Sequence, residues 1–193
     1  MTGRPIPELA AAARDVMDVL DKAGLSGCLI GGLVVQRWGQ PRATTDVDFS
    51  VLAPYGDEHP VLDVLLQHFA PRRSDARAFA LANRVLLLIT SSGVSVDVGL
   101  AAFEFEFEAL ERASLWEAIP GVQLRTCAAE HLIVYKLVAA RLHDLADVEG
   151  IVRRQAGRLD VECVRRWGRV FAELKDDPDL LRPFEETMRK LTL

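Results

Sequence analysis

The chain has 193 residues, half of them hydrophobic, and a formal net charge of −5. This length suits one large domain, or one domain with a helical extension, and the apolar content excludes global disorder. The acidic balance argues against a general nucleic-acid coat, which needs an excess of Lys and Arg, although a local basic groove stays open. The three widely spaced cysteines indicate reduced thiols rather than disulfides or a zinc cluster. We expect no signal peptide, no membrane span and a cytoplasmic location.

The predicted elements mix strands and helices up to residue 126 and are helical after it. Helices are indicated where apolar residues recur every three or four positions, and strands where short apolar runs lie between turn residues. In chain order we predict helices 8–23, 33–38 and 61–69 and strands 28–30, 47–52, 77–82, 84–90, 92–100 and 122–126. Helices 128–155, 160–174 and 179–193 follow, the first of them with a break near Gly150. Segment 103–113 is ambiguous between strand and helix.

This order predicts an α+β fold with an α/β-like alternation. A mixed sheet with flanking helices should occupy residues 1–126. A helical C-terminal region should occupy residues 127–193, and because no flexible linker separates the two parts, we expect them to pack together.

Two alternating aspartates interrupt a strand that otherwise has the composition of a core strand. Residues two apart on a strand share a face, so Asp46 and Asp48 should project together while Val47 and Phe49 face the core. Asp97 interrupts a later apolar strand in the same way. Three ionised carboxylates at close quarters repel one another unless a cation lies between them. Magnesium prefers oxygen ligands, and two ions ~3.5–4 Å apart can clamp an in-line phosphoryl displacement, so we predict a two-metal Mg²⁺ site.

A glycine pair precedes these acids at a predicted strand-to-helix turn. Gly31 and Gly32 would let the backbone approach a phosphate, and the start of the helix offers free N–H groups and a partial positive charge. An ordinary tight turn is the alternative. The glycine pair, with Asp-x-Asp 14 residues later and a further strand aspartate, favours phosphate chemistry.

The string GGLVVQRWGQPRATTDVDFSV resembles the DNA polymerase β-like nucleotidyltransferases, and is most similar to the AbiEii-type (type IV toxin) branch. The resemblance covers residues 27–152. It implies Asp46, Asp48 and Asp97 as metal ligands, with Asp97 also as the base for the attacking hydroxyl. It also implies that Gly31 and Gly32 cradle the nucleoside triphosphate.

Three further residues belong to the predicted nucleotide site. The block LIVYKLVAARLHDLADV resembles a helix of the same family, which implies that Lys136 contacts substrate phosphate; a solvated helix face is the alternative. Arg42 either neutralises the nearby acids or binds phosphate. Thr45 either places a hydroxyl near the metal or serves only as a strand former.

These observations predict a magnesium-dependent transfer of a nucleoside monophosphate from a nucleoside triphosphate to a hydroxyl acceptor. The resemblance favours tRNA as acceptor, with an antitoxin protein as partner, whereas the acidic total favours a small hydroxylated molecule such as an aminoglycoside. Arginines in segments 72–77 and 153–169 either line a surface for RNA or pair with neighbouring acids. A nucleotide-binding or partner-binding module without turnover is the non-enzymatic alternative.

Overall fold

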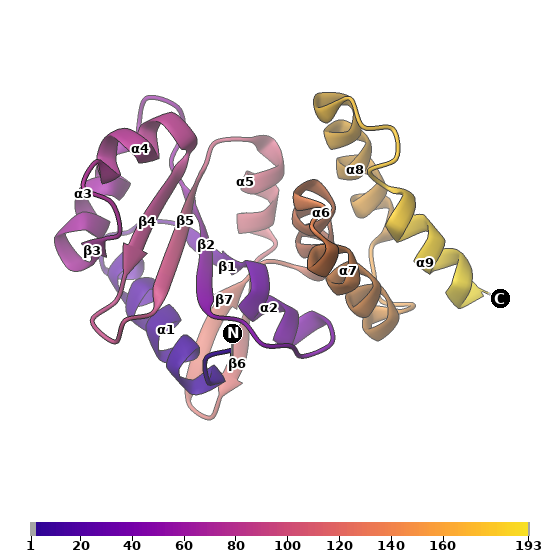
Figure 1. The fold of residues 1–193 in the computed structure, drawn as a ribbon, viewed down its shortest axis with the longest axis horizontal. Helices are drawn as coiled ribbons and strands as arrows, with labels where there is room; N and C mark the ends of the chain where they lie inside the picture. The colour runs from indigo at the N-terminus through magenta and orange to yellow at the C-terminus, as the bar shows by residue number, and fades with distance from the viewer. Residues whose placement is uncertain (1–2, 193) are drawn as a thin grey trace. The chain divides into compact units, whose positions relative to one another are not determined.

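The computed structural model describes residues 3–192 and contains a mixed sheet whose strands alternate with helices along the chain, followed by further helices (Figure 1). The predicted α+β class is therefore confirmed. The helices are α1 (Ile6–Lys22), α2 (Gly31–Trp38), α3 (His59–His68), α4 (Ala76–Asn83), α5 (Glu104–Glu111), α6 (Ala129–Ala139), α7 (Leu142–Gln155), α8 (Val161–Lys175) and α9 (Arg182–Thr192). The strands are β1 (Gly27–Ile30), β2 (Asp46–Leu52), β3 (Ala70–Pro71), β4 (Val85–Ile89), β5 (Ser95–Ala101), β6 (Ser114–Ile119) and β7 (Val122–Thr126).

The chain divides into two compact units. The sheet unit comprises the residues up to Leu33 together with Ala43–Cys127, and the helical unit comprises Val34–Arg42 together with the residues from Ala128 onward. Segment Val34–Arg42 belongs to the helical unit, and the last turn of α7 bonds to it. Arg154 donates to the Gly39 carbonyl at 2.5 Å. No helix in residues 3–192 has the length and hydropathy that a membrane-spanning helix requires.

The strands of the sheet unit are ordered β3-β4-β5-β2-β1-β7-β6. Strand β2 lies at the centre, antiparallel to β1 and parallel to β5, and β4 continues the sheet antiparallel to β5. Figure 1 shows β2, β5 and β4 side by side in that sequence. The carboxyl-rich strands predicted from the sequence are therefore direct neighbours.

One face of the two central strands forms the core. Val47, Phe49 and Val51 on β2 are fully buried, as are Val96 and Val98 on β5. Helix α1 packs against β1, β2, β6 and β7 through its own buried stripe. Because side chains alternate along a strand, the residues between these apolar positions point to the opposite face. That opposite face carries the aspartates.

Four of the sequence-based element predictions differ from the structure. Segment 77–82, predicted as a strand, lies in α4, where Ala76 and Ala80 are spaced four apart and both buried. The helix predicted over 128–155 is broken at Ala140, which has a left-handed φ of 54°, and not near Gly150, which lies within α7. Strands β3 and β6 were not predicted; most residues of β6 are exposed or only partly buried, so its apolar pattern is weak.

The ambiguous segment 103–113 forms helix α5. Glu106 accepts hydrogen bonds from the backbone N–H groups of Ala102 (2.8 Å) and Phe103 (3.1 Å), which satisfies donors at the start of the helix. Phe105 and Ala109, four residues apart, supply its buried side. The alternation of Phe and Glu that suggests a strand is thus overridden by helix capping and helical burial.

Candidate active site

Strands β2 and β5 place the three aspartates on one face of the sheet. Asp46 and Asp48 alternate with buried residues on β2. In the parallel pairing of the two strands, Asp48 lies directly opposite Asp97, and Asp46 lies opposite Ser95. Neighbouring strands are ~4.8 Å apart, so the Asp48 and Asp97 side chains start from adjacent points on the same surface. Asp46 and Asp48 are partly buried, and the Asp97 side chain is 36% exposed, so the group is open to solvent.

The glycine turn lies against one of these carboxylates. Gly31 directly follows β1 and has a φ of +71°, a conformation that favours glycine. A Cβ atom at position 31 would overlap the Asp48 carboxylate. The backbone N–H of Gly32 donates to Asp48 Oδ2 at 3.3 Å. The turn and Asp48 therefore form one compact feature, in which the start of α2 faces a carboxylate.

The third carboxylate has a cationic neighbour that sequence reasoning did not assign to the site. Arg72 donates a hydrogen bond and forms an ion pair with Asp97. Burial raises the pKa of Asp97, and the negative charge of Asp46 raises it further, while Arg72 acts in the opposite direction. Burial, the largest of these effects, disfavours the ionised form of Asp97, and a cation bound beside the carboxylate would favour that form.

Threonine hydroxyls flank the first aspartate. Thr44 is buried and donates its hydroxyl hydrogen bond to Asp46 Oδ1 at 3.1 Å. Thr45, the residue predicted from the sequence, is only partly buried. The hydroxyl that orients Asp46 thus comes from the neighbour of the predicted residue.

The donor set fits a hard divalent cation. Three carboxylates on adjacent strands offer the oxygen ligands that Mg²⁺ prefers, and one of them, Asp97, is paired with Arg72. Within residues 3–192, Asp46, Asp48 and Asp97 do not form a group in which one carboxylate oxygen of each lies within 4.8 Å of the others. A rotation of the Asp97 side chain away from Arg72 would alter that spacing without moving the strands.

Arg42 and Lys136, both predicted to bind phosphate, lie in the helical unit and are paired there. Lys136 is 4% exposed, and its Nζ lies 2.8 Å from Asp144 Oδ1 and 3.0 Å from Asp147 Oδ2. Arg42 forms a bidentate ion pair with Asp147, in which Nε donates to Oδ1 at 2.7 Å and Nη2 donates to Oδ2 at 2.8 Å. In this arrangement their charges are compensated by buried carboxylates, and the network ties α6 and α7 to the segment after α2.

The two buried carboxylates of this network are held ionised. Burial by itself would raise the pKa of Asp144 and of Asp147. Hydrogen bonds from Arg141 and Lys136 to Asp144, and from Arg42 and Lys136 to Asp147, outweigh that effect and lower both pKa values. The network is therefore a stable set of opposite charges at neutral pH.

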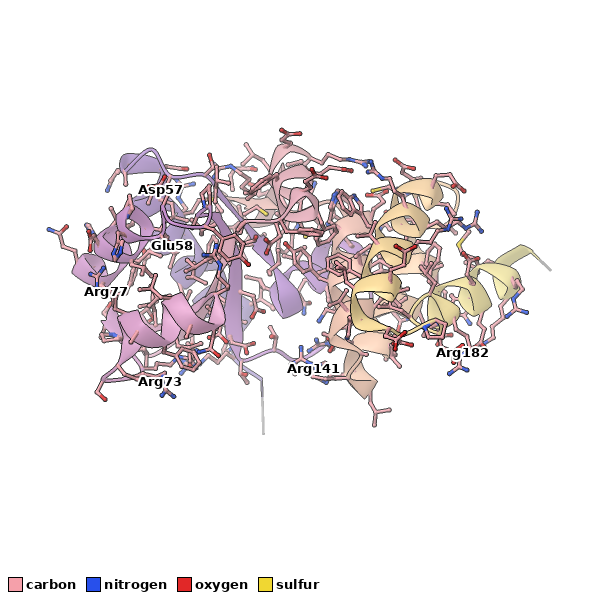
Figure 2. All side chains as sticks on the ribbon, turned by 90° about the horizontal axis from the view of Figure 1, so that it is seen from above. Asp57, Glu58, Arg73, Arg77, Arg141 and Arg182 are labelled. Atoms are coloured by element: carbon pink, nitrogen blue, oxygen red, sulfur yellow. The ribbon has the colours of Figure 1, made fainter. Side chains whose placement is uncertain are left out.

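Many arginines outside the site also pair with acids. Figure 2 shows Arg73 and Arg77 on the α3–α4 side of the sheet unit. Arg73 bonds to Asp75 at 2.8 Å, and Arg77 bonds to Asp63 at 2.6 Å. In the helical unit, Arg153 pairs with Glu149, and Arg165 pairs with Glu162 and Glu185. These pairs favour the interpretation in which the arginines of segments 72–77 and 153–169 pair with neighbouring acids over the one in which they line a surface for RNA.

Comparison with known proteins places the chain in a family. A family profile matches residues 10–180 and is described as "Nucleotidyl transferase of unknown function (DUF2204)". None of the curated proteins matches. An antigenic nucleotidyltransferase-like protein from Paracoccidioides brasiliensis has a similar fold, with a TM-score of 0.52 at 13% identity, covering 93% of each chain. The antibiotic-resistance factor ANT(2'')-Ia has a TM-score of 0.50 at 11% identity, covering 97% of this chain and 95% of its own.

These findings confirm the predicted superfamily, and the two structural likenesses show that the fold is shared. The family match extends over both units, from within α1 to the turn before α9. The chain therefore belongs to the nucleotidyl transferase family DUF2204.

Proposed function

We propose that this nucleotidyltransferase uses Mg²⁺ held by Asp46, Asp48 and Asp97 to transfer a nucleoside monophosphate from a nucleoside triphosphate to a hydroxyl group. The observation that carries the proposal is the register of the two central strands, which sets Asp48 directly opposite Asp97. Asp46, two residues before Asp48, adds a third oxygen ligand on the same face.

The glycine turn is the proposed binding site for the triphosphate. The absence of a side chain at Gly31 lets Asp48 approach the turn, and backbone N–H groups at the start of α2 can donate hydrogen bonds to phosphate oxygens. Bound Mg²⁺ supplies charge neutralisation for the phosphates and for the leaving pyrophosphate. The chain's own contribution is to hold the triphosphate against the sheet with its α-phosphorus toward the acceptor.

The reaction proposed for this site is a displacement at the α-phosphorus. The acceptor oxygen forms a bond to the α-phosphorus, the bond between the α-phosphorus and its bridging oxygen breaks, pyrophosphate leaves, and the hydroxyl proton passes to the Asp97 carboxylate. Holding the triphosphate and the acceptor in one fixed geometry makes this displacement effectively unimolecular, which lowers the barrier.

A small hydroxylated molecule is the acceptor that the charges support best. Long nucleic acids are recognised by uncompensated Lys and Arg side chains along a surface. Here Arg73, Arg77 and Arg165 each pair with acids, and the chain carries a net charge of −5. A tRNA acceptor and an antitoxin partner, as in the AbiEii-type enzymes, rest on the sequence motif alone.

The test is a transfer assay. Each of the four labelled nucleoside triphosphates is incubated with Mg²⁺ and with two acceptor pools, one of small hydroxylated compounds including aminoglycosides and one of total tRNA. We expect label in the small compounds only, dependent on Mg²⁺, and reduced about 100-fold or more in Asp48→Asn because a metal ligand is lost.

Asp75→Asn is the matched control, because Asp75 is an exposed acid of the same unit that pairs with Arg73. It should transfer label at the wild-type rate. Equal transfer by wild type and Asp48→Asn would refute the proposed site, and transfer to tRNA alone would refute the proposed acceptor. Binding of nucleotide with Mg²⁺ but no transfer to either pool would support the module without turnover.

A further inference from the structure

The side chain of Arg72 extends across strand β4 to the carboxylate of Asp97. The backbone N–H of Arg72 donates to the Leu87 carbonyl at 3.0 Å, which continues the β3–β4 pairing by one residue. Leu87 is in turn the register partner of Asp97. Arg72, Leu87 and Asp97 therefore stand in one row, and the guanidinium passes over β4 to bond to Asp97.

This ion pair is easily exchanged. The side chain of Arg72 is 30% exposed and that of Asp97 is 36% exposed, so water screens the attraction between them. The Lys136–Asp144 pair, by contrast, has side chains that are 5% and 0% exposed. A divalent cation can therefore displace Arg72 from Asp97, but Asp97 cannot present both oxygens to the cation until Arg72 leaves.

We propose that Arg72 is a substrate-binding residue that exchanges partners when the metal and the triphosphate bind. It occupies Asp97 first, yields that carboxylate to the metal, and then pairs with the phosphates of the triphosphate that accompanies the metal. This inference rests on the proposed function, since it requires the metal at Asp97. A planar guanidinium suits this exchange because it forms paired hydrogen bonds with carboxylates and with phosphates.

The exchange couples metal and triphosphate binding. Metal alone must displace Arg72 without giving it a new partner, so metal alone should bind weakly. Triphosphate supplies that partner, so it should strengthen metal binding, and metal should strengthen triphosphate binding by the same factor. Removing the guanidinium should weaken the coupling from both sides.

The experiment uses the full chain, Mn²⁺ as the metal probe and inorganic tripolyphosphate as the phosphate probe. Electron paramagnetic resonance measures Mn²⁺ binding without phosphate, and calorimetry measures binding of the preformed Mn²⁺–tripolyphosphate complex. In Arg72→Ala and Arg72→Gln we expect Mn²⁺ alone to bind about 3-fold more tightly, because an exposed ion pair no longer competes. The complex should bind about 10-fold more weakly, because a charge-assisted contact to phosphate is lost.

Two matched variants separate this role from a structural one. Arg72→Lys keeps the positive charge and should restore part of the binding of the complex. Arg73→Ala removes the adjacent arginine, which pairs with Asp75, and should change neither measurement. Circular dichroism confirms that each variant is folded.

The outcomes distinguish this inference from the proposed function. If Mn²⁺ binding is lost in Asp48→Asn but unchanged in both folded Arg72 variants, the role of Arg72 is refuted and the metal site stands. If wild type does not bind Mn²⁺, or binds it no more tightly than Asp48→Asn does, the metal site is refuted and the role of Arg72 with it.

Discussion

Gly31 meets two independent demands at a single residue. Its φ of +71° is costly for any residue with a side chain, and the space where a Cβ would stand is filled by the Asp48 carboxylate. The same close approach lets the Gly32 N–H reach Asp48. The geometry of the glycine turn and the position of a proposed metal ligand are therefore linked through one missing methyl group.

Gly31→Ala should destabilise the protein and abolish nucleotidyl transfer. We expect the free energy of unfolding to fall by about 2–5 kcal/mol, the sum of a left-handed conformation and steric overlap with Asp48. Gly121→Ala is the control, because Gly121 has a φ of +79° and open space around its Cβ position. It should lose only about 1 kcal/mol and keep its activity. Urea denaturation measures the free energy of unfolding of both variants. An equal decrease in Gly31→Ala and Gly121→Ala would show that Asp48 does not constrain position 31.

At the scale of elements, the break between α6 and α7 builds the buried charge network. On a continuous helix Asp144 would lie about 12 Å along the axis from Lys136 and about 80° around it. Ala140, with a φ of 54°, ends α6, and Arg141 begins the next helix and donates to Asp144 Oδ2 at 2.6 Å. The change of direction brings Asp144 Oδ1 to 2.8 Å from Lys136 Nζ.

Ala140→Gly should stabilise the protein, because glycine adopts the left-handed conformation without the penalty that a Cβ carries. We expect a gain of about 0.5–1 kcal/mol in the free energy of unfolding. Ala139→Gly, one residue earlier in the last turn of α6 and also exposed, should lose a similar amount. Thermal unfolding distinguishes them, and a shift of the same sign in both variants would contradict the assigned break.

Charge is distributed differently in the two units of the molecule. In the sheet unit, the pKa of Asp97 is raised, because burial and Asp46 disfavour its ionised form. In the helical unit, Asp144 and Asp147 are buried, yet their pKa values are lowered by cations within the same unit. Asp144 and Asp147 thus stabilise the fold when they are ionised, whereas burial of Asp97 disfavours its ionised form.

Asp147→Asn should lower the free energy of unfolding at pH 7 by about 3 kcal/mol, because Arg42 and Lys136 lose a buried partner. A carboxyl with a lowered pKa contributes stability above its unfolded pKa of about 3.9 and loses it as the pH falls through the folded value. The difference between wild type and Asp147→Asn should therefore shrink below about pH 4.

Urea denaturation at pH 7 and pH 3 checks this prediction. The exposed Asp75→Asn serves as control and should resemble wild type at both pH values, because water screens its pair with Arg73. A difference between wild type and Asp147→Asn that stays constant from pH 7 to pH 3 would show that Asp147 does not act through its charge.

The sequence by itself determined the features that depend on local geometry. Alternation along one strand placed Asp46 and Asp48 on a common face, and the conformational freedom of glycine marked the turn at Gly31, because both follow from backbone periodicity and sterics. The helical character of the C-terminal part also followed from its apolar spacing. The role of these residues in catalysis stays a prediction.

Only the tertiary structure decided which distant residues meet. Arg72 and Asp97 are 25 residues apart and come together because β4 lies between their strands, and Lys136 is buried because the chain turns at Ala140. Segment 77–82 lies in helix α4, which packs against β4. Strand order, helix breaks and burial depend on contacts between segments far apart in the chain, and apolar periodicity within a segment carries no information about them.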